Sequence, residues 1–187
     1  MNFLWFIWLA VAGAGLVVWQ AFNRLAALDS RCDRAFADID VQLKHRHGLL
    51  PNLLETVRAF AQQERDIFDK VTAARGAALR ARTPEQQMVA EADLSTRLAQ
   101  LLTVVETNPQ LQSSTHFQQL RMEIADAEHK IAASRRFFNA AVDEYNATLG
   151  QFPANVVASL AGNHRKRAFF DIGVERVLLD DAPVLKF

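Results

Sequence analysis

Residues 38–57 read DIDVQLKHRHGLLPNLLETV and combine an apolar stripe with many charged side chains. The apolar residues recur at steps of three, four and seven positions, which is the spacing of one face of an α-helix. The same spacing extends upstream, without an intervening glycine or proline, through Leu25, Leu28, Cys32 and Phe36. The stretch therefore predicts a long amphipathic helix that decides the fold.

Pro51 interrupts this pattern. Its ring removes a backbone donor and disfavours helix in the preceding residue, and Gly48 lies just upstream. We expect a kink or short break at residues 48–51, with Pro51 in the first turn of a second helix that runs to about Ala78.

The N-terminal residues predict a membrane anchor. Residues 3–19 contain no polar side chain, and the first charged side chain is Arg24. At a rise of ~1.5 Å per residue, a helix extended to Phe22 is ~30 Å long, the thickness of a bilayer core. Tryptophans flank the segment as in an interfacial aromatic belt. The anchor residues we single out are Trp5, Trp8, Gly13, Gly15 and Trp19.

The residues on either side of this segment indicate whether it is cleaved and how it is oriented in the membrane. A cleaved signal peptide normally starts with basic residues, and residues 1–10 contain none, so we expect an uncleaved anchor. Basic residues follow the segment, which by the positive-inside rule places the N-terminus outside the bacterial inner membrane and the remaining chain in the cytoplasm. One face of the anchor helix carries Ala10, Gly13, Ala14 and Val17. Either two anchor helices pack closely through this face, or the face simply contacts lipid.

Two further signals start helices after residue 80. Thr83, Pro84 and Gln86 form a capping box, and Thr115 with Gln118 repeats it before the longest apolar pattern, with TNPQLQSST between them as a loop. Amphipathic segments joined by short loops are typical of a bundle. We predict an all-α fold: a single N-terminal transmembrane helix that continues into an antiparallel bundle of three to four long helices.

The pattern changes after Gly150. QFPANVVASLAG predicts a short amphipathic helix between Pro153 and Gly162, and the remaining residues, which lack a sustained helical period, predict an extended tail packed on the bundle with room for a short strand. The predicted domains are the anchor at 1–23, the cytoplasmic bundle at 24–149, and the short helix with the tail at 150–187.

A basic tract follows the short helix. Its residues belong to a solvated linker, or they attract anionic lipid while the short helix lies on the membrane by its apolar face. The second interpretation requires this end of the bundle to fold back toward the bilayer. The tract consists of His164, Arg165, Lys166 and Arg167.

The polar residues of the opening stretch predict a polar network or a partner surface. We expect Asp40 to pair with Lys44, and Arg46 or His47 to meet a carboxylate on another helix. The candidate residues are Asp38, Asp40, Lys44, Arg46, His47, Asn52 and Glu55.

Other patterns argue against enzymatic chemistry. Acidic and basic residues balance at 21 each, which does not favour a nucleic-acid partner, and the single cysteine gives neither a disulfide framework nor a zinc pattern. A di-iron bundle needs paired Glu-x-x-His motifs, and the nearest match is one Asp126-x-x-His129. Nucleophile-elbow and phosphate-loop motifs are absent. We expect no catalytic residue, no metal and no cofactor.

Four blocks, DIDVQLKHRHGLLPNLLETV, RRFFNAAVDEYN, FPANVVA and the closing PVLKF, together resemble the bacterial LemA family in order and spacing, over nearly the whole chain. The resemblance implies an N-terminal membrane helix, a cytoplasmic helical bundle and a tail, and it implies no reaction. Some relatives in the family are associated with magnetosome membranes. The chain departs from the family pattern at Phe22-Asn23, where a Tyr-Asn pair is usual, and around residues 177–181, where the tail is longer and more apolar.

These expectations converge on a non-enzymatic scaffold or assembly protein, anchored in the inner membrane and forming homo-oligomers there. The lipid bilayer is its first partner. The alternatives are an adaptor or regulator of another membrane protein, for example a membrane protease, and a membrane-shaping protein.

Overall fold

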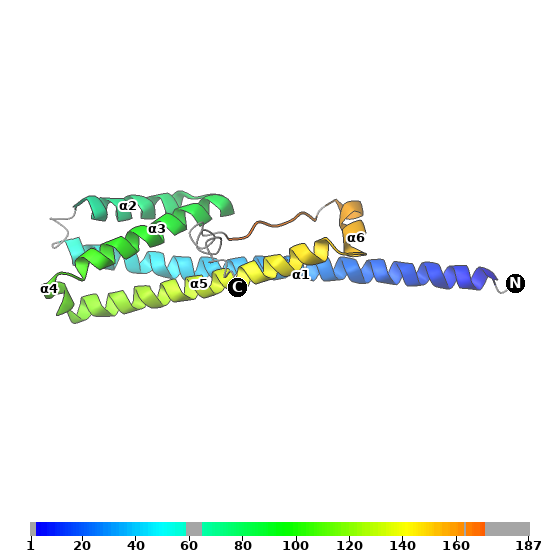
Figure 1. Cartoon of the computed structure of the whole chain (residues 1–187), viewed down its shortest axis with the longest axis horizontal. Coiled ribbons are helices and arrows are strands. Elements are labelled where there is room, and N and C mark those ends of the chain that lie inside the picture. The colour runs from blue at the N-terminus through cyan, green and yellow to red at the C-terminus, as the bar shows by residue number, and fades with distance from the viewer. Residues whose placement is uncertain (1–2, 59–64, 163, 171–187) are drawn as a thin grey trace, which may run out of the picture. The chain divides into compact units, whose positions relative to one another are not determined.

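The computed structural model describes residues 3–58, 65–162 and 164–170, with side chains from Trp5 onward, and these residues form helices joined by short loops without a strand (Figure 1). The all-α prediction is confirmed, whereas the antiparallel course of the bundle stays a prediction. Residues 171–187, where we expected an extended tail, lie outside the described residues. The helices are α1 (Phe3–Arg58), α2 (Arg65–Arg80), α3 (Pro84–Val105), α4 (Pro109–Gln112), α5 (Thr115–Leu149) and α6 (Ala154–Ala161).

The helix α1 continues through Pro51 as one element of 56 residues, so the predicted break at residues 48–51 is wrong. A proline inside a helix costs about 3 kcal/mol. Burying an apolar side chain stabilises by about 1.5–3 kcal/mol, and several such residues next to the proline are buried, so packing outweighs the lost hydrogen bond. These residues are Leu50, Leu53, Leu54 and Val57.

The chain divides into two compact units, and both α1 and α5 contribute to each. The first unit consists of Met1–Asp40 and Ala133–Phe169, and the second of Val41–Ala132 and Phe170–Phe187. In the second unit, α1, α2, α3 and α5 bury one hydrophobic core. Its largest contributors include Leu50, Leu53, Val57, Val71, Leu94, Leu98, Leu101, Phe117 and Ile124.

Local hydrogen bonds explain where the shorter helices begin. The Thr83 side chain accepts from the Gln86 backbone N–H, so the first half of the predicted capping box is formed. The Gln86 side chain accepts from the backbone N–H of Arg82, one residue before the cap, in place of the N–H of Thr83. Ahead of α5, Phe117 donates its N–H to Ser114 Oγ, so Ser114 rather than Thr115 caps this helix. The loop before it contains the one-turn helix α4, which Asn108 caps.

In the first unit, the apolar stripe of α1 packs on α5. Phe36 and Phe138 meet edge to face with ring centroids 5.7 Å apart, and Leu25, Cys32 and Ile39 are fully or almost fully buried. The helix α6 also belongs to this unit and ends at Ala161. Its C-cap is Gly162, whose φ of 68° is the left-handed conformation that glycine adopts without strain. The predicted short helix between Pro153 and Gly162 is therefore confirmed.

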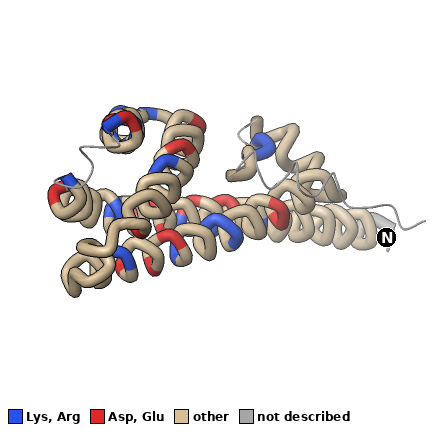
Figure 2. The backbone as a smooth tube through the Cα atoms, turned by 60° about the vertical axis from the view of Figure 1, so that its left-hand side comes forward, with Lys and Arg blue, Asp and Glu red and all other residues tan. Residues whose placement is uncertain are grey.

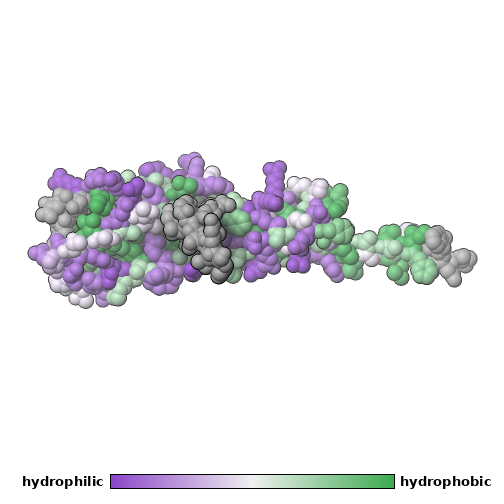
Figure 3. Space-filling view, in the orientation of Figure 1, coloured by the Kyte–Doolittle hydropathy of each residue, from purple (hydrophilic) through white to green (hydrophobic). Residues whose placement is uncertain are grey.

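The N-terminal part of α1 is exposed on every side. Each residue from 5 to 20 is exposed, and Ala21 is the first buried residue of the helix. This part is long and apolar enough to cross a membrane. Figure 2 shows it without a charged residue, and Figure 3 shows it as a hydrophobic rod.

Candidate functional site

Among the described residues, Arg46 on α1 in the second unit has the most deeply buried charged side chain. Its Nη2 donates to Glu91 on α3, and its Nη1 donates to Glu128 Oε1 on α5 over 2.5 Å and to Ser95 Oγ on α3. Glu91 also contacts His47, with 2.8 Å between Oε1 and the imidazole Nε2. We call Arg46, His47, Glu91, Ser95 and Glu128 the Arg46 cluster.

Burial makes the Arg46 cluster energetically important. The Arg46 side chain is 0% exposed and Glu91 is 2% exposed, whereas Glu128 remains 32% exposed. A buried guanidinium is tolerated only where carboxylates compensate its charge, and removing one partner leaves an expensive unpaired charge. The cluster therefore fixes the register of α1, α3 and α5 within the second unit.

The other candidate residues of the 38–57 stretch lie outside the Arg46 cluster. Asn52 and Glu55 are exposed, and Glu55 makes a 3.7 Å ion pair with Arg58 one turn later on the same helix. Asp38 and Lys44 are exposed and Asp40 is half-buried. The structure thus brings only Arg46 and His47, of the seven candidates, into the cluster.

A second polar cluster lies in the first unit and centres on Arg167. Its Nε donates to Asp29 Oδ1 on α1 over 2.8 Å, and its Nη1 donates to Asp33 Oδ1 over 2.7 Å. Its Nη2 lies 2.7 Å from Asp29 Oδ1 in the ion pair. Asn146 on α5 exchanges two 2.9 Å hydrogen bonds with the Arg167 backbone. This Arg167 clamp holds the segment after α6 against α1 and α5.

Aromatic rings complete the Arg167 clamp. The guanidinium carbon lies 5.9 Å from the centre of the Tyr145 ring. The His164 ring lies 6.5 Å from that of Tyr145 and meets Phe22 edge to face at 6.1 Å. Of the predicted basic tract, His164 and Arg167 therefore pack against the protein, while Arg165 and Lys166 are exposed.

Burial changes the pKa values of residues in and beside the clamp. Burial raises the pKa of the Cys32 thiol, and it raises the pKa of the Tyr145 phenol. Burial opposes the charge of Arg167, but hydrogen bonds to Asp33 and Asp29 outweigh it and raise the pKa of the guanidinium. Cys32 therefore stays a neutral thiol in this unit, in contrast to a reactive thiolate.

The anchor residues are presented outward. Trp5, Trp8 and Trp19 are 79%, 71% and 64% exposed. A Cβ atom added to Gly13 or Gly15 would meet nothing within 4 Å, so both glycines border open space.

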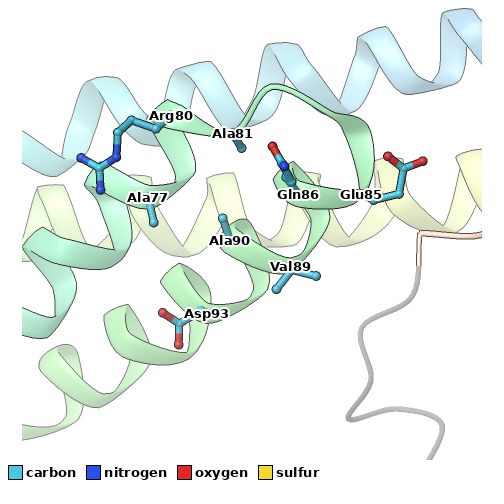
Figure 4. Close-up of a pocket in the computed structure, with 8 residues that line it drawn as sticks. All are labelled: Ala77, Arg80, Ala81, Glu85, Gln86, Val89, Ala90 and Asp93. Atoms are coloured by element: carbon cyan, nitrogen blue, oxygen red, sulfur yellow. The ribbon is translucent and has the colours of Figure 1, made fainter.

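An open groove of about 890 Å³ lies between α2 and α3 (Figure 4). Small apolar side chains form much of its lining, and Arg80, Glu85 and Asp93 add charge. Its remaining lining residues are Ala77, Ala81, Gln86, Val89 and Ala90.

The metal motif considered from the sequence is not assembled in the described residues. Asp126 forms a 2.7 Å ion pair with Lys130 on the same helix. Within residues 3–58, 65–162 and 164–170, no three His, Cys, Asp or Glu side chains come together as a metal site.

Sequence reasoning missed the partners that complete both clusters. Glu91 occupies a position of the apolar stripe of α3, three residues before Leu94, and a carboxylate at such a position signals a buried ion pair. Buried Arg135 interrupts the α5 stripe in the same way, four residues after Ile131. Asp29 and Asp33 share a face of α1 at i,i+4, but no sequence signal points from them to Arg167.

The chain is similar to one known protein family and to magnetosome proteins. The LemA family profile matches residues 35–187. The chain is 28% identical over 82 residues to magnetosome protein MamQ of Magnetospirillum gryphiswaldense, which covers 44% of this chain and 30% of the relative. It is 30% identical over 80 residues to magnetosome proteins MamQ 1 and MamQ 2 of Paramagnetospirillum magneticum, covering 43% of this chain and 29% of each relative. The matched segment thus spans less than a third of these relatives.

Proposed function

Because the chain belongs to the LemA family, we propose that it is a non-enzymatic scaffold, held in the bacterial inner membrane by the N-terminal part of α1 and self-associating there. The matched segment covers too little of the MamQ proteins for their place in magnetosomes to be extended to this protein.

The observation that carries this proposal is the change in exposure along α1. Residues 5–20 are exposed around the whole helix, whereas from Ala21 onward one side of the same helix is buried. Apolar surface in water costs about 25 cal/mol per Å², so a helix that exposes aromatic and aliphatic side chains on every side is stable in lipid. Because α1 is one continuous helix, the same element forms the anchor and packs against the other helices.

The orientation of the protein follows from the charges beside the anchor. Arg24, Arg31 and Arg34 follow the apolar stretch on the same helix, within about five turns. The positive-inside rule favours an outer N-terminus and cytoplasmic helical units. The neutral thiol of Cys32 is compatible with that reducing compartment.

Self-association is proposed through the small-residue face of the anchor. Ala10, Gly13 and Val17 recur at i, i+3 and i+7, which lets two helices approach closely. Both Gly13 and Gly15 border open space in the single chain, and they lie ~200° apart around the helix. The substitution Gly13→Leu therefore tests the face, and Gly15→Leu is its matched control.

The experiment is chemical crosslinking of the full-length protein in native membranes. We expect a ladder of oligomers for the unmodified protein and Gly15→Leu, and a weaker ladder for Gly13→Leu. If the unmodified protein gives only a monomer band after crosslinking, a self-associating scaffold is excluded. Equal ladders for both variants would exclude the Gly13 face as the contact.

The groove between α2 and α3 favours a second candidate function, an adaptor or regulator of another membrane protein. An apolar lining with charged residues is a surface on which a partner's helix packs. A photo-crosslinker in place of Val89, which is 74% exposed at the groove, distinguishes the candidates. An adaptor gives one adduct with a foreign protein at fixed stoichiometry, whereas the scaffold gives adducts with copies of itself or none.

A further inference from the structure

The helix α6 lies at the point on α1 where the exposed stretch ends. In Figure 1, α6 stands beside α1, near the C-terminal end of α5, with its axis steeply inclined to that of α1. An independent contact supports this placement, since the ring of His164, three residues after the last residue of α6, meets the Phe22 ring. All these residues belong to the first unit.

The two sides of α6 differ in what they contact. Ala154, Val157 and Ala158 are buried against the unit. Val156 and Leu160, one turn apart on α6, are 47% and 81% exposed, and Phe152, in the turn that precedes the helix, is 81% exposed. Because Val156 and Leu160 are spaced i, i+4, they share one side of α6, and together with Phe152 they make up the exposed apolar edge of this helix and its preceding turn.

This apolar edge adjoins another apolar surface. Phe22 on α1 is 44% exposed, and the exposed tryptophan nearest to it is Trp19. Figure 3 shows hydrophobic residues at α6 next to the hydrophobic rod of the N-terminal part of α1. Exposed basic residues follow at Arg165 and Lys166, and Arg24 is exposed on α1.

We propose that α6 lies in the headgroup region of the bilayer that the anchor crosses, with Phe152, Val156 and Leu160 inserted toward the acyl chains and Arg165 and Lys166 at the lipid phosphates. This inference rests on the proposed membrane anchoring. A helix steeply inclined to the anchor, as α6 is in Figure 1, lies close to the plane of the membrane when the anchor crosses it. A short amphipathic helix with neighbouring basic residues binds such an interface.

Continuity with the anchor makes lipid the occupant of this edge. The edge begins where the apolar surface of α1 ends, so the same bilayer that covers Trp19 and Phe22 reaches α6 without a further partner. The Arg167 clamp supports the arrangement, because it fixes the chain after α6 to α1 through Asp29 and Asp33. His164 is held by Phe22 and Tyr145, which leaves Arg165 and Lys166 as the residues of the tract that face outward.

The test places an environment-sensitive NBD fluorophore on α6 in full-length protein reconstituted in vesicles of phosphatidylethanolamine and phosphatidylglycerol. Cys32 is the only cysteine and is buried, so Leu160→Cys and Asn155→Cys are labelled in a Cys32→Ala background. Positions 155 and 160 are both exposed and lie ~140° apart around the helix, which makes Asn155→Cys the matched control. All three tryptophans lie in the anchor, so their own fluorescence in unlabelled protein reports anchor insertion.

We expect nitroxide lipids labelled high on the acyl chain to quench the probe at position 160, and aqueous iodide to quench the probe at position 155. If iodide reaches both positions while the lipid nitroxide quenches the tryptophans, α6 is not at the interface, although anchoring stands. Equal lipid quenching at both positions would also overturn the inferred orientation. If the tryptophans escape lipid quenching, the anchor itself is absent and both proposals fail.

The basic residues are tested separately by charge reversal. The double substitution Arg165→Glu and Lys166→Glu is expected to lower lipid quenching at position 160 in these anionic vesicles. Unchanged quenching would overturn the assignment of these two side chains to the lipid phosphates.

Discussion

Arg46 Nη1 donates a hydrogen bond to Glu128 Oε1 over 2.5 Å and so joins α1 to α5 across 82 positions of sequence. The same guanidinium also binds Glu91 on α3. One buried cation therefore connects three helices of the second unit. Of the polar residues of the 38–57 stretch, Arg46 helps to fix the register in which these helices pack.

The first prediction concerns the carboxylate at the centre of the Arg46 cluster. Glu91→Ala leaves Arg46 buried with less compensation, so it should lower the free energy of unfolding by about 3–5 kcal/mol. Urea unfolding of the full-length protein in detergent, followed by circular dichroism, measures this. Glu55→Ala is the matched control, because Glu55 is exposed and pairs only with Arg58 in the described contacts. Equal midpoints for Glu91→Ala and Glu55→Ala would contradict a structural role of the cluster.

The second prediction concerns Pro51 inside α1. Replacing it with alanine restores a backbone donor and removes the strain of a proline inside a helix, so Pro51→Ala should stabilise the protein, by at most about 3 kcal/mol. The same unfolding assay measures the change. If Pro51 instead began a new helix, where its missing donor matters little, the substitution would bring no gain.

The sequence predicted helices better than it predicted their interruptions and partners. The periodic apolar residues, Thr83 and Gly162 located helices because their signals are local. The predicted break at Pro51 was wrong because Leu50 and Leu53 are buried against distant parts of the chain, and this packing keeps the helix continuous through the proline. The expectation that Arg46 or His47 meets a carboxylate is found in the structure. The position of Glu91 in the apolar stripe of α3 was an available signal, whereas Glu128 could not be identified, since pairing between distant helices leaves no spacing signal.

The third prediction concerns the Arg167 clamp. Arg167→Gln loses the ion pairs with Asp29 and Asp33, so the segment after α6 should detach more often. Limited chymotrypsin digestion at Phe169 and Phe170 should then proceed faster than in the unmodified protein. Arg165→Gln is the control, because Arg165 is exposed and its loss leaves the clamp intact. Identical cleavage rates in the two variants would show that the clamp does not hold this segment.

The fourth prediction concerns stability at alkaline pH. Burial raises the pKa of Cys32 above its ordinary value of 9.0 and that of Tyr145 above 10.0. The unfolded chain therefore releases these protons at lower pH than the folded chain, and their contribution to stability, complete below pH 9, declines as pH rises through the folded pKa values. Cys32→Ala should flatten the decline of the unfolding free energy above pH 9. A decline as steep as that of the unmodified protein would contradict the raised pKa of the thiol.

The most direct test of the whole account is alkaline carbonate extraction of native membranes, followed by mass measurement of the full-length protein. We predict that the protein stays in the membrane pellet with its N-terminal residues intact, because residues 3–22 cross the bilayer. Release into the supernatant, or a mass that lacks the N-terminal segment, would contradict membrane anchoring and the scaffold proposed from it.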